Sequence, residues 1–398
     1  MASCFEIVAE DKKTKARTGR LKTAHGVVET PMFMPVATKM TGKYICIDDF
    51  HSIGAQAIIV NGFITSLSPG THIVKKSGGI HKFMNFHKTI FTDSGGFQLI
   101  KSSFSPFVDY NGIKLKSPFD GRNILLTPES AIKMQCELGS DVAMCLDDMP
   151  PYVKDKSEIK KSVDITRDWA TRCKKTFEHI KKNNLKDNLK DNLKNKHTTT
   201  MTNKGQLLFG IIQGGVFKDL REESAKFIDS LDFDGIAIGG FGEGETPKEM
   251  LDMVMHCERF IDKKKPRYLM GIGSPELLLD AIACGVDCFD SVFPTQNGRR
   301  NTLFTWEGKL RITNKQYEHD LSPLDKNCDC FVCKSFTRAY LHHLASHGES
   351  SAKRYLSYHN VYFIHRLVER ARCEIAAGTY SDFMKEMKKK YEKNGGQK

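Results

Sequence analysis

The sequence of 398 residues lacks any run of about 18 consecutive apolar residues, the length that a membrane-spanning helix requires. Its opening segment, MASCFEIVAEDKKTKARTGR, lacks the apolar stretch of a secretory signal peptide. The 12 cysteines follow no regular spacing, which argues against a disulfide framework and favours reduced thiols. These absences predict a cytoplasmic protein with no membrane partner.

A dinucleotide-binding fingerprint is also missing, because no G-x-G-x-x-G motif opens a helix after the first apolar runs. Charge, by contrast, is unbalanced: 60 Lys and Arg residues against 48 Asp and Glu residues give a net charge of +12. That excess suits a nucleic-acid partner electrostatically. The composition of the source lineage would produce the same excess, so charge alone does not identify the partner.

Eight short apolar runs alternate with glycine-containing or polar turns and helix-like stretches. Continuous apolar strands that alternate with helices are typical of parallel βαβ units, and eight of them predict an α/β fold of the (β/α)8 TIM barrel type. Amphipathic segments such as 128–139 and 274–285 supply the intervening helices. The eight runs are Phe33–Val36, Ala57–Val60, Thr89–Thr92, Val142–Leu146, Leu208–Ile212, Gly235–Ile238, Arg267–Met270 and Asp287–Phe289.

The chain divides into three predicted parts. Residues 1–320 form the catalytic barrel, residues 321–362 a zinc-binding subdomain, and residues 363–398 a helical segment that completes the barrel and ends in a charged tail. Within the barrel part, the unit NLKD repeats in residues 181–204, where Asn and Asp are poor helix formers and Leu supplies only a thin apolar stripe. We therefore expect an exposed insertion between two elements there.

Polar or flexible residues follow most of the predicted strands. Active sites of (β/α)8 barrels gather at the C-terminal ends of the strands, so these residues are expected to meet. Two carboxylates on either side of an anomeric carbon suit a glycosyl transfer through a covalent intermediate, and a third carboxylate beside an amide and free glycine backbone suits a purine-like base. The residues at these positions are Asn61, Asp93, Asp147, Gln213, Gly239, Gly240, Met270 and Asp290.

Three cysteines lie within six residues in the motif Cys328-Asp329-Cys330-Phe331-Val332-Cys333. Their thiolates can converge on one tetrahedral ion, and a structural zinc site needs four Cys or His ligands. The motif lies after the predicted barrel, which favours a structural clip over a reaction centre. The alternative is three reduced cysteines that are merely close in sequence.

Several segments together resemble the tRNA-guanine transglycosylases, over about residues 5 to 390. The resemblance implies a (β/α)8 barrel with an inserted zinc subdomain, which exchanges the wobble guanine of a tRNA anticodon for a 7-deazaguanine base. The segments are FTDSGGFQ (91–98), GSDVAMCLDD (139–148), FGIIQGG (209–215), YLMGIGSP (268–275), FDSVFPT (289–295), CDCFVC (328–333), RAYLHH (338–343) and YHN (358–360).

The resemblance also implies a role for particular residues. Asp290 falls on the nucleophile and Asp93 on the general acid and base. The zinc ligands of the family, which hold one structural ion per chain, fall on Cys328, Cys330, Cys333 and His359. The base is expected against Asp147, Gln213, Gly240, Met270, Ser94 and Phe97. Arg299 and Arg300 are suited to tRNA phosphates or base edges, with a solvated turn as the alternative.

Partners and base choice follow from the same resemblance. It implies a tRNA with a wobble guanine, a free 7-deazaguanine base, and a homodimer or a heterodimer with a related subunit. Gln296, Glu243 and Met149 depart from the bacterial pattern, so queuine, its aminomethyl precursor or both remain open as the incoming base. Two other classes also remain: a non-catalytic RNA-binding partner subunit, which retention of Asp93, Asp147 and Asp290 disfavours, and an unrelated retaining glycosidase, which the cysteine motif disfavours.

Overall fold

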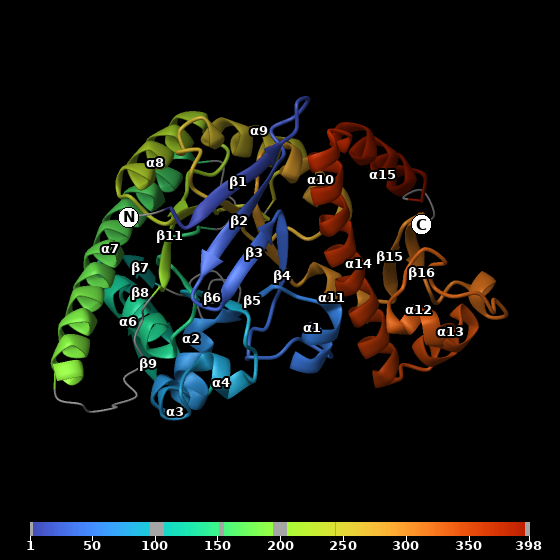
Figure 1. Ribbon diagram of the computed structural model, residues 1–398, viewed down its shortest axis with the longest axis horizontal. Coiled ribbons are helices and arrows are strands. Elements are labelled where there is room, and N and C mark those ends of the chain that lie inside the picture. The colour runs from blue at the N-terminus through green and yellow to red at the C-terminus, as the bar shows by residue number, and fades with distance from the viewer. Residues whose placement is uncertain (1–2, 96–106, 151–154, 194–204, 243, 395–398) are drawn as a thin grey trace.

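Eight parallel strands form one sheet that closes into a barrel, in a computed structural model that describes residues 3–95, 107–150, 155–193, 205–242 and 244–394 (Figure 1). Each strand pairs with its neighbours in chain order, and a bridge between Val36 and Ile59 joins the first strand to the second. The strands are β4 (Met32–Pro35), β5 (Ala57–Asn61), β6 (Thr89–Asp93), β10 (Val142–Met144), β11 (Leu207–Ile212), β12 (Gly235–Ile238), β13 (Arg267–Leu269) and β14 (Cys288–Ser291). All eight predicted strands and the TIM-barrel class are confirmed.

Helices cover the outside of the barrel, among them the two predicted from amphipathic segments. Two of them begin with a clear start signal: α6 (Pro128–Leu138) and α9 (Pro247–Glu258) each have a threonine cap and a proline in the first turn. The other helices between the strands include α1 (Ile47–Ile53), α2 (Gly62–Thr65), α3 (Thr71–Lys76), α4 (Ile80–Met84), α7 (Lys156–Leu193), α8 (Lys218–Ser230) and α10 (Pro275–Ala283).

The interior of the barrel is a packed core. Phe91, Phe209 and Tyr268 fill it, with Phe91 edge-on to both other rings. A three-stranded antiparallel sheet, β1 (Phe5–Glu10), β2 (Arg17–Thr23) and β3 (Gly26–Thr30), adds Phe5 and Leu21 to the same cluster. The turn between β2 and β3 contacts Asp141, which precedes β10, so this sheet covers the N-terminal end of the barrel. The opposite end is left for a site.

Part of the predicted insertion, residues 181–193, is helical in the structure. Helix α7 continues to Leu193, so the first half of residues 181–204 extends a helix that begins at Lys156, and residues 194–204 lie outside the described chain. The repeat therefore prolongs a helix that the preceding, well-packed segment has already nucleated, and propagation is far less costly than nucleation.

A second small sheet, β7 (Phe107–Asp109), β8 (Gly112–Lys116) and β9 (Asn123–Leu126), lies between β6 and α6. After the barrel come β15 (Thr302–Thr305), β16 (Gly308–Arg311), α12 (Phe331–Ser335) and α13 (Arg338–Ser346). In Figure 1 these elements lie beside the barrel, at the lower right.

Helix α14 (Ser350–Ala377) joins the two parts without a break, so the predicted boundary at residue 362 falls inside it. The side chain of Asn360 on α14 accepts from the Phe304 N–H and donates to the carbonyls of Pro294 and Thr302. Gly298 on α11 (Phe293–Arg299) touches the α14 backbone: a Cβ there would lie 2.7 Å from Leu356 C and from Ser357 N. The final helix, α15 (Tyr380–Asn394), packs on α10 through the Tyr380 hydroxyl, which donates to Leu279 O.

No helix in the described ranges is both long enough and apolar enough to cross a membrane.

Candidate active site

The Asp290 carboxylate lies at the C-terminal end of β14 and accepts two hydrogen bonds. The Tyr268 hydroxyl donates to Oδ1 over 2.6 Å, and the Gly271 N–H donates to the same oxygen over 3.0 Å. Burial raises the pKa of Asp290, and the bonds from Tyr268 and Gly271 lower it in part. Because both donors stabilise the ionised form, this carboxylate suits a nucleophile.

Asp93 lies at the C-terminal end of β6 in a different environment. Its Oδ2 is 3.4 Å from Asn61 Nδ2, whereas its Oδ1 is buried with no hydrogen-bond partner among the described residues. Burial, followed by the charge of Asp290, raises the pKa of Asp93 to about 8. The two carboxyl groups therefore interact electrostatically, and near neutral pH Asp93 retains its proton while Asp290 has donors for a negative charge.

A third carboxylate forms a hydrogen-bonded pair with an amide. Gln213 Nε2 donates to Asp147 Oδ2 over 2.6 Å, and burial raises the pKa of Asp147 to about 6. Gly240 follows β12 with φ +78°, a backbone conformation that favours glycine, and a Cβ there would lie 2.2 Å from Gln213 Oε1. Carboxylate, amide and glycine backbone together offer hydrogen-bonding groups of both kinds for a planar base.

Three other residues, Ser94, Met270 and Phe97, were predicted to contact the base, and the structure describes the first two. Ser94 is buried directly after Asp93, and Met270 is partly buried directly before Gly271. Phe97 lies outside the described residues. Thus Asp93, Ser94, Asp147, Gln213, Gly240, Met270 and Asp290 all lie at the C-terminal ends of barrel strands.

Arg299 and Arg300 lie at the end of α11, the helix that follows the Asp290 strand. Arg299 is partly exposed and its Nε donates to Thr295 O over 3.1 Å, while Arg300 is exposed. Both arginines therefore lie near the surface after β14, as a docking residue requires.

Tyr268 is a site residue that was not predicted from the sequence. It is the middle residue of β13, and its ring lies in the barrel core while its hydroxyl reaches Asp290. A phenol in an inward-facing strand position could have drawn attention, because a buried tyrosine hydroxyl needs a partner.

The Cys328, Cys330, Cys333 and His359 side chains converge. His359 Nδ1 lies 3.9, 3.5 and 3.3 Å from the three sulfur atoms in that order. The other ring nitrogen, Nε2, is 2.9 Å from the Phe304 carbonyl, an acceptor, so Nε2 carries the proton and Nδ1 presents a lone pair to the sulfurs. Three sulfurs and one imidazole nitrogen are the donor set of a closed structural zinc site.

A second cluster of His25, His81 and Asp141 lies at the other end of the barrel. Each imidazole meets a different oxygen of Asp141 over 2.9 Å, and the N–H groups of His25 and Ile90 donate to the same two oxygens. The two rings stack with centroids 3.5 Å apart, so their lone pairs lie in separate planes and do not meet at one ion. The Asp141 carboxylate therefore has a structural role: its hydrogen bonds join the segments that carry His25, His81 and Ile90.

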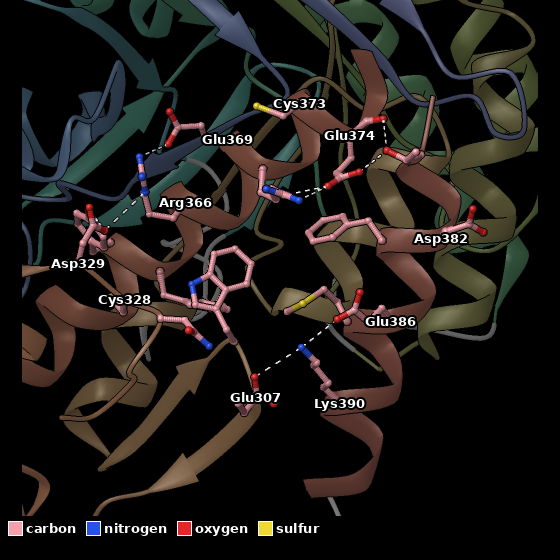
Figure 2. Close-up of a pocket in the computed structure, with 18 residues that line it drawn as sticks. Glu307, Cys328, Asp329, Arg366, Glu369, Cys373, Glu374, Asp382, Glu386 and Lys390 are labelled. Atoms are coloured by element: carbon pink, nitrogen blue, oxygen red, sulfur yellow. Dashed lines mark hydrogen bonds and ion pairs between the residues drawn. The ribbon is translucent and has the colours of Figure 1, made fainter. Parts of the chain in front are cut away.

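A cavity of about 810 Å³ lies between α14, α15 and the segment after β15 (Figure 2). None of the predicted catalytic or base-contacting residues lines it. Figure 2 shows that its charged groups pair with one another, as in Arg366 with Glu369 and Lys390 with Glu386. This cavity is therefore separate from the carboxylates at the strand ends.

The chain is similar to one family of known proteins over nearly its whole length. Residues 11–393 match the family model described as queuine tRNA-ribosyltransferase. The chain is 40% identical to the queuine tRNA-ribosyltransferase of Halothermothrix orenii over 98% of each chain. It is 41% identical to that of Caldanaerobacter subterraneus over 97% of each chain, and 40% identical to that of Bacillus subtilis over 97% of this chain and 96% of the relative.

Proposed function

Because the chain belongs to the queuine tRNA-ribosyltransferase family, the tRNA-guanine transglycosylases, we propose that it replaces the wobble guanine of tRNA anticodons with a 7-deazaguanine base. The observation that carries this proposal is the pair Asp290 and Asp93, two interacting carboxyl groups of which Asp290 accepts two hydrogen bonds that favour a negative charge, whereas the charge of Asp290 helps to raise the pKa of Asp93 to about 8. A non-catalytic partner subunit would have no use for that pair.

The first half of the reaction forms a covalent intermediate. Ionised Asp290 attacks C1′ of the wobble nucleoside, the C1′–N9 bond breaks, and the protonated Asp93 gives its proton to the departing guanine. The product is an ester between Asp290 and the ribose. The wobble nucleotide lies in an unpaired loop, so turning it into the barrel mouth costs little.

The second half reverses these roles. The incoming base loses its N9 proton to the Asp93 carboxylate and attacks C1′, and the ester bond breaks to restore Asp290. Two inversions at C1′ give net retention. Asp147, Gln213 and the Gly240 backbone would hold each base in turn, with Ser94, Met270 and Phe97 around it.

Zinc is proposed for the Cys328, Cys330, Cys333 and His359 site. There the ion would supply folding free energy and no chemistry, because four protein donors leave no open coordination position. The cluster ties α14 to α12, and α14 also packs on α11 directly after the nucleophile strand. Zinc would thus hold the surface on which Arg299 and Arg300 meet tRNA.

The physiological base is proposed to be queuine, its aminomethyl precursor or both. Glu243, which would face the 7-substituent, lies outside the described residues, so its effect on base choice stays a prediction: Glu243→Val should shift kcat/KM against queuine. A homodimer or a heterodimer with a related subunit is likewise proposed from the family.

The direct test is incorporation of labelled guanine into unmodified tRNA by the purified protein. Exchange without ATP would support the proposal, and a tRNA complex that survives denaturing gel electrophoresis would support the ester. A protein that binds tRNA but incorporates no base would instead be the partner subunit.

A further inference from the structure

Arg221 is a fully buried cation beside the base pocket that the proposed mechanism does not use. It lies in α8 with 0% of its surface exposed. Its Nη1 donates to Gly239 O over 2.8 Å and to Ile212 O over 3.2 Å, and its Nε donates to Gly215 O over 2.7 Å. These carbonyls belong to the segments at the ends of β11 and β12, on either side of the proposed base-binding residues Gln213 and Gly240.

In the described parts of the chain the hydrogen bonds of Arg221 go to backbone carbonyls, and the carboxylate of Glu245 acts on it electrostatically. The guanidinium also stacks on the Phe241 ring, 4.1 Å from its centroid, and Nη2 is buried without a hydrogen-bond partner among the described residues. Burial lowers the pKa of Arg221 to about 10. Burying a cation is costly, so the three hydrogen bonds that hold Arg221 in place indicate a positioning role for it.

Arg267 is a second buried arginine with which Arg221 can be compared. Arg267 is equally buried, but it lies at the N-terminal end of the barrel and its Nη2 is 3.4 Å from the carboxylate of Glu258. Arg267 therefore belongs to a paired structural network, whereas the partners of Arg221 are neutral carbonyl groups at the pocket.

The bond to Gly239 O fixes the direction of a neighbouring donor. In a trans peptide the carbonyl of one residue and the N–H of the next point in opposite directions. Because Arg221 holds the Gly239 carbonyl, the Gly240 N–H is held on the opposite side of the peptide, and the Gly239 N–H is itself tied to Ile212 O over 3.0 Å. Glycine at φ +78° would otherwise leave this peptide free to turn.

We propose that Arg221 is a positioning residue for base recognition, which keeps the Gly240 N–H aimed at the 6-oxygen of the bound purine and so makes the pocket select 6-keto over 6-amino bases. The inference rests on the proposed function and deepens it. A 6-amino group presents a donor to the fixed Gly240 donor, and two facing donors leave both groups unpaired. If the peptide turned over, its carbonyl would accept from the amino group and the selection would weaken.

The test compares guanine with 2,6-diaminopurine, which keeps the 2-amino group and carries an amino group in place of the 6-oxygen. In Arg221→Met, the KM for guanine should rise about tenfold with a smaller change in kcat, and the ratio of kcat/KM for the two bases should fall about tenfold, as expected for one misdirected hydrogen bond. Arg221→Lys, which keeps a cation and a donor, should recover part of the ratio. Arg267→Lys is the matched control and should leave the ratio unchanged even if it unfolds at a lower temperature.

An unchanged ratio in folded Arg221→Met, or a fall in kcat with an unchanged KM for guanine, overturns the inference. If Arg221→Met does not fold, Arg221→Lys decides by the same ratio, with a reduced ratio supporting the inference and a wild-type ratio overturning it. Failure of the wild type to incorporate guanine refutes the proposed function instead. Calorimetric binding of the two bases to the wild type and to Arg221→Lys then tests the inference separately.

Discussion

Replacing Asp93 with asparagine should stabilise the protein while it abolishes base exchange. Burial and the Asp290 charge raise the Asp93 pKa from 3.8 to about 8. Between these two pH values the folded protein holds a proton that the unfolded chain has released, so stability falls as pH rises through this window and levels off above about pH 8. An amide of the same shape carries no such charge.

The magnitude follows from the shift. Each pH unit in the window costs up to about 1.4 kcal/mol, so the upper limit at pH 7 is about 4 kcal/mol. Asp93 retains some exposure, and water there screens part of the cost, so we expect Asp93→Asn to be about 2 kcal/mol more stable at pH 7. The gain should be largest above pH 8 and should vanish near pH 4.

Urea unfolding midpoints of wild type and Asp93→Asn at pH 5, 7 and 8.5 measure this difference. Asp290→Asn serves as the control: it removes the second cause of the shift, so the stability of that variant should depend less steeply on pH. A difference between wild type and Asp93→Asn that is equal at pH 5 and pH 8.5 would refute the reasoning, because it would show that Asp93 ionises as readily in the folded protein as in the unfolded chain.

Four further predictions concern other residues. Asp290→Asn should keep tRNA binding but lose exchange and the denaturation-resistant tRNA complex; exchange by a variant shown by mass spectrometry to contain Asn would contradict the nucleophile assignment. Tyr268→Phe removes the 2.6 Å donor from Asp290 and should lower kcat about tenfold while shifting the acidic limb of the pH–rate profile upward; an unchanged profile would count against it. Cys330→Ala should lose zinc by elemental analysis and much of the zinc folding energy, on the order of 10 kcal/mol, and full retention of zinc would refute the ligand set. Asp141→Asn should lower the free energy of unfolding by about 3 kcal/mol at pH 7. Hydrogen bonds led by that from His81 lower the pKa of Asp141, and their contribution disappears once the carboxylate is protonated, so the loss should shrink as pH falls below about 4. A loss independent of pH would show that the charge of Asp141 is not involved.

Patterns confined to a few neighbouring residues were sufficient to predict much of this protein. Continuous apolar runs predicted all eight barrel strands, because a strand buried on both faces needs no partner information to be recognised. The strand-end rule then placed Asp93, Asp147 and Asp290 together at one end of the barrel. The short spacing of Cys328, Cys330 and Cys333 indicated a metal clip for the same local reason.

Tertiary packing decided what such patterns do not contain. The extent of α7 and the unbroken course of α14 past residue 362 depend on contacts between distant segments. So do the hydroxyl of Tyr268 on Asp290, the Nδ1 of His359 among three sulfurs, and the guanidinium of Arg221 behind Gly239. Burial raises the pKa of both Asp93 and Asp290, the donors from Tyr268 and Gly271 oppose the rise at Asp290, and all of these are properties of the closed barrel. Residue types and spacing thus determined which groups the site contains, and the fold determined which of them carries the proton.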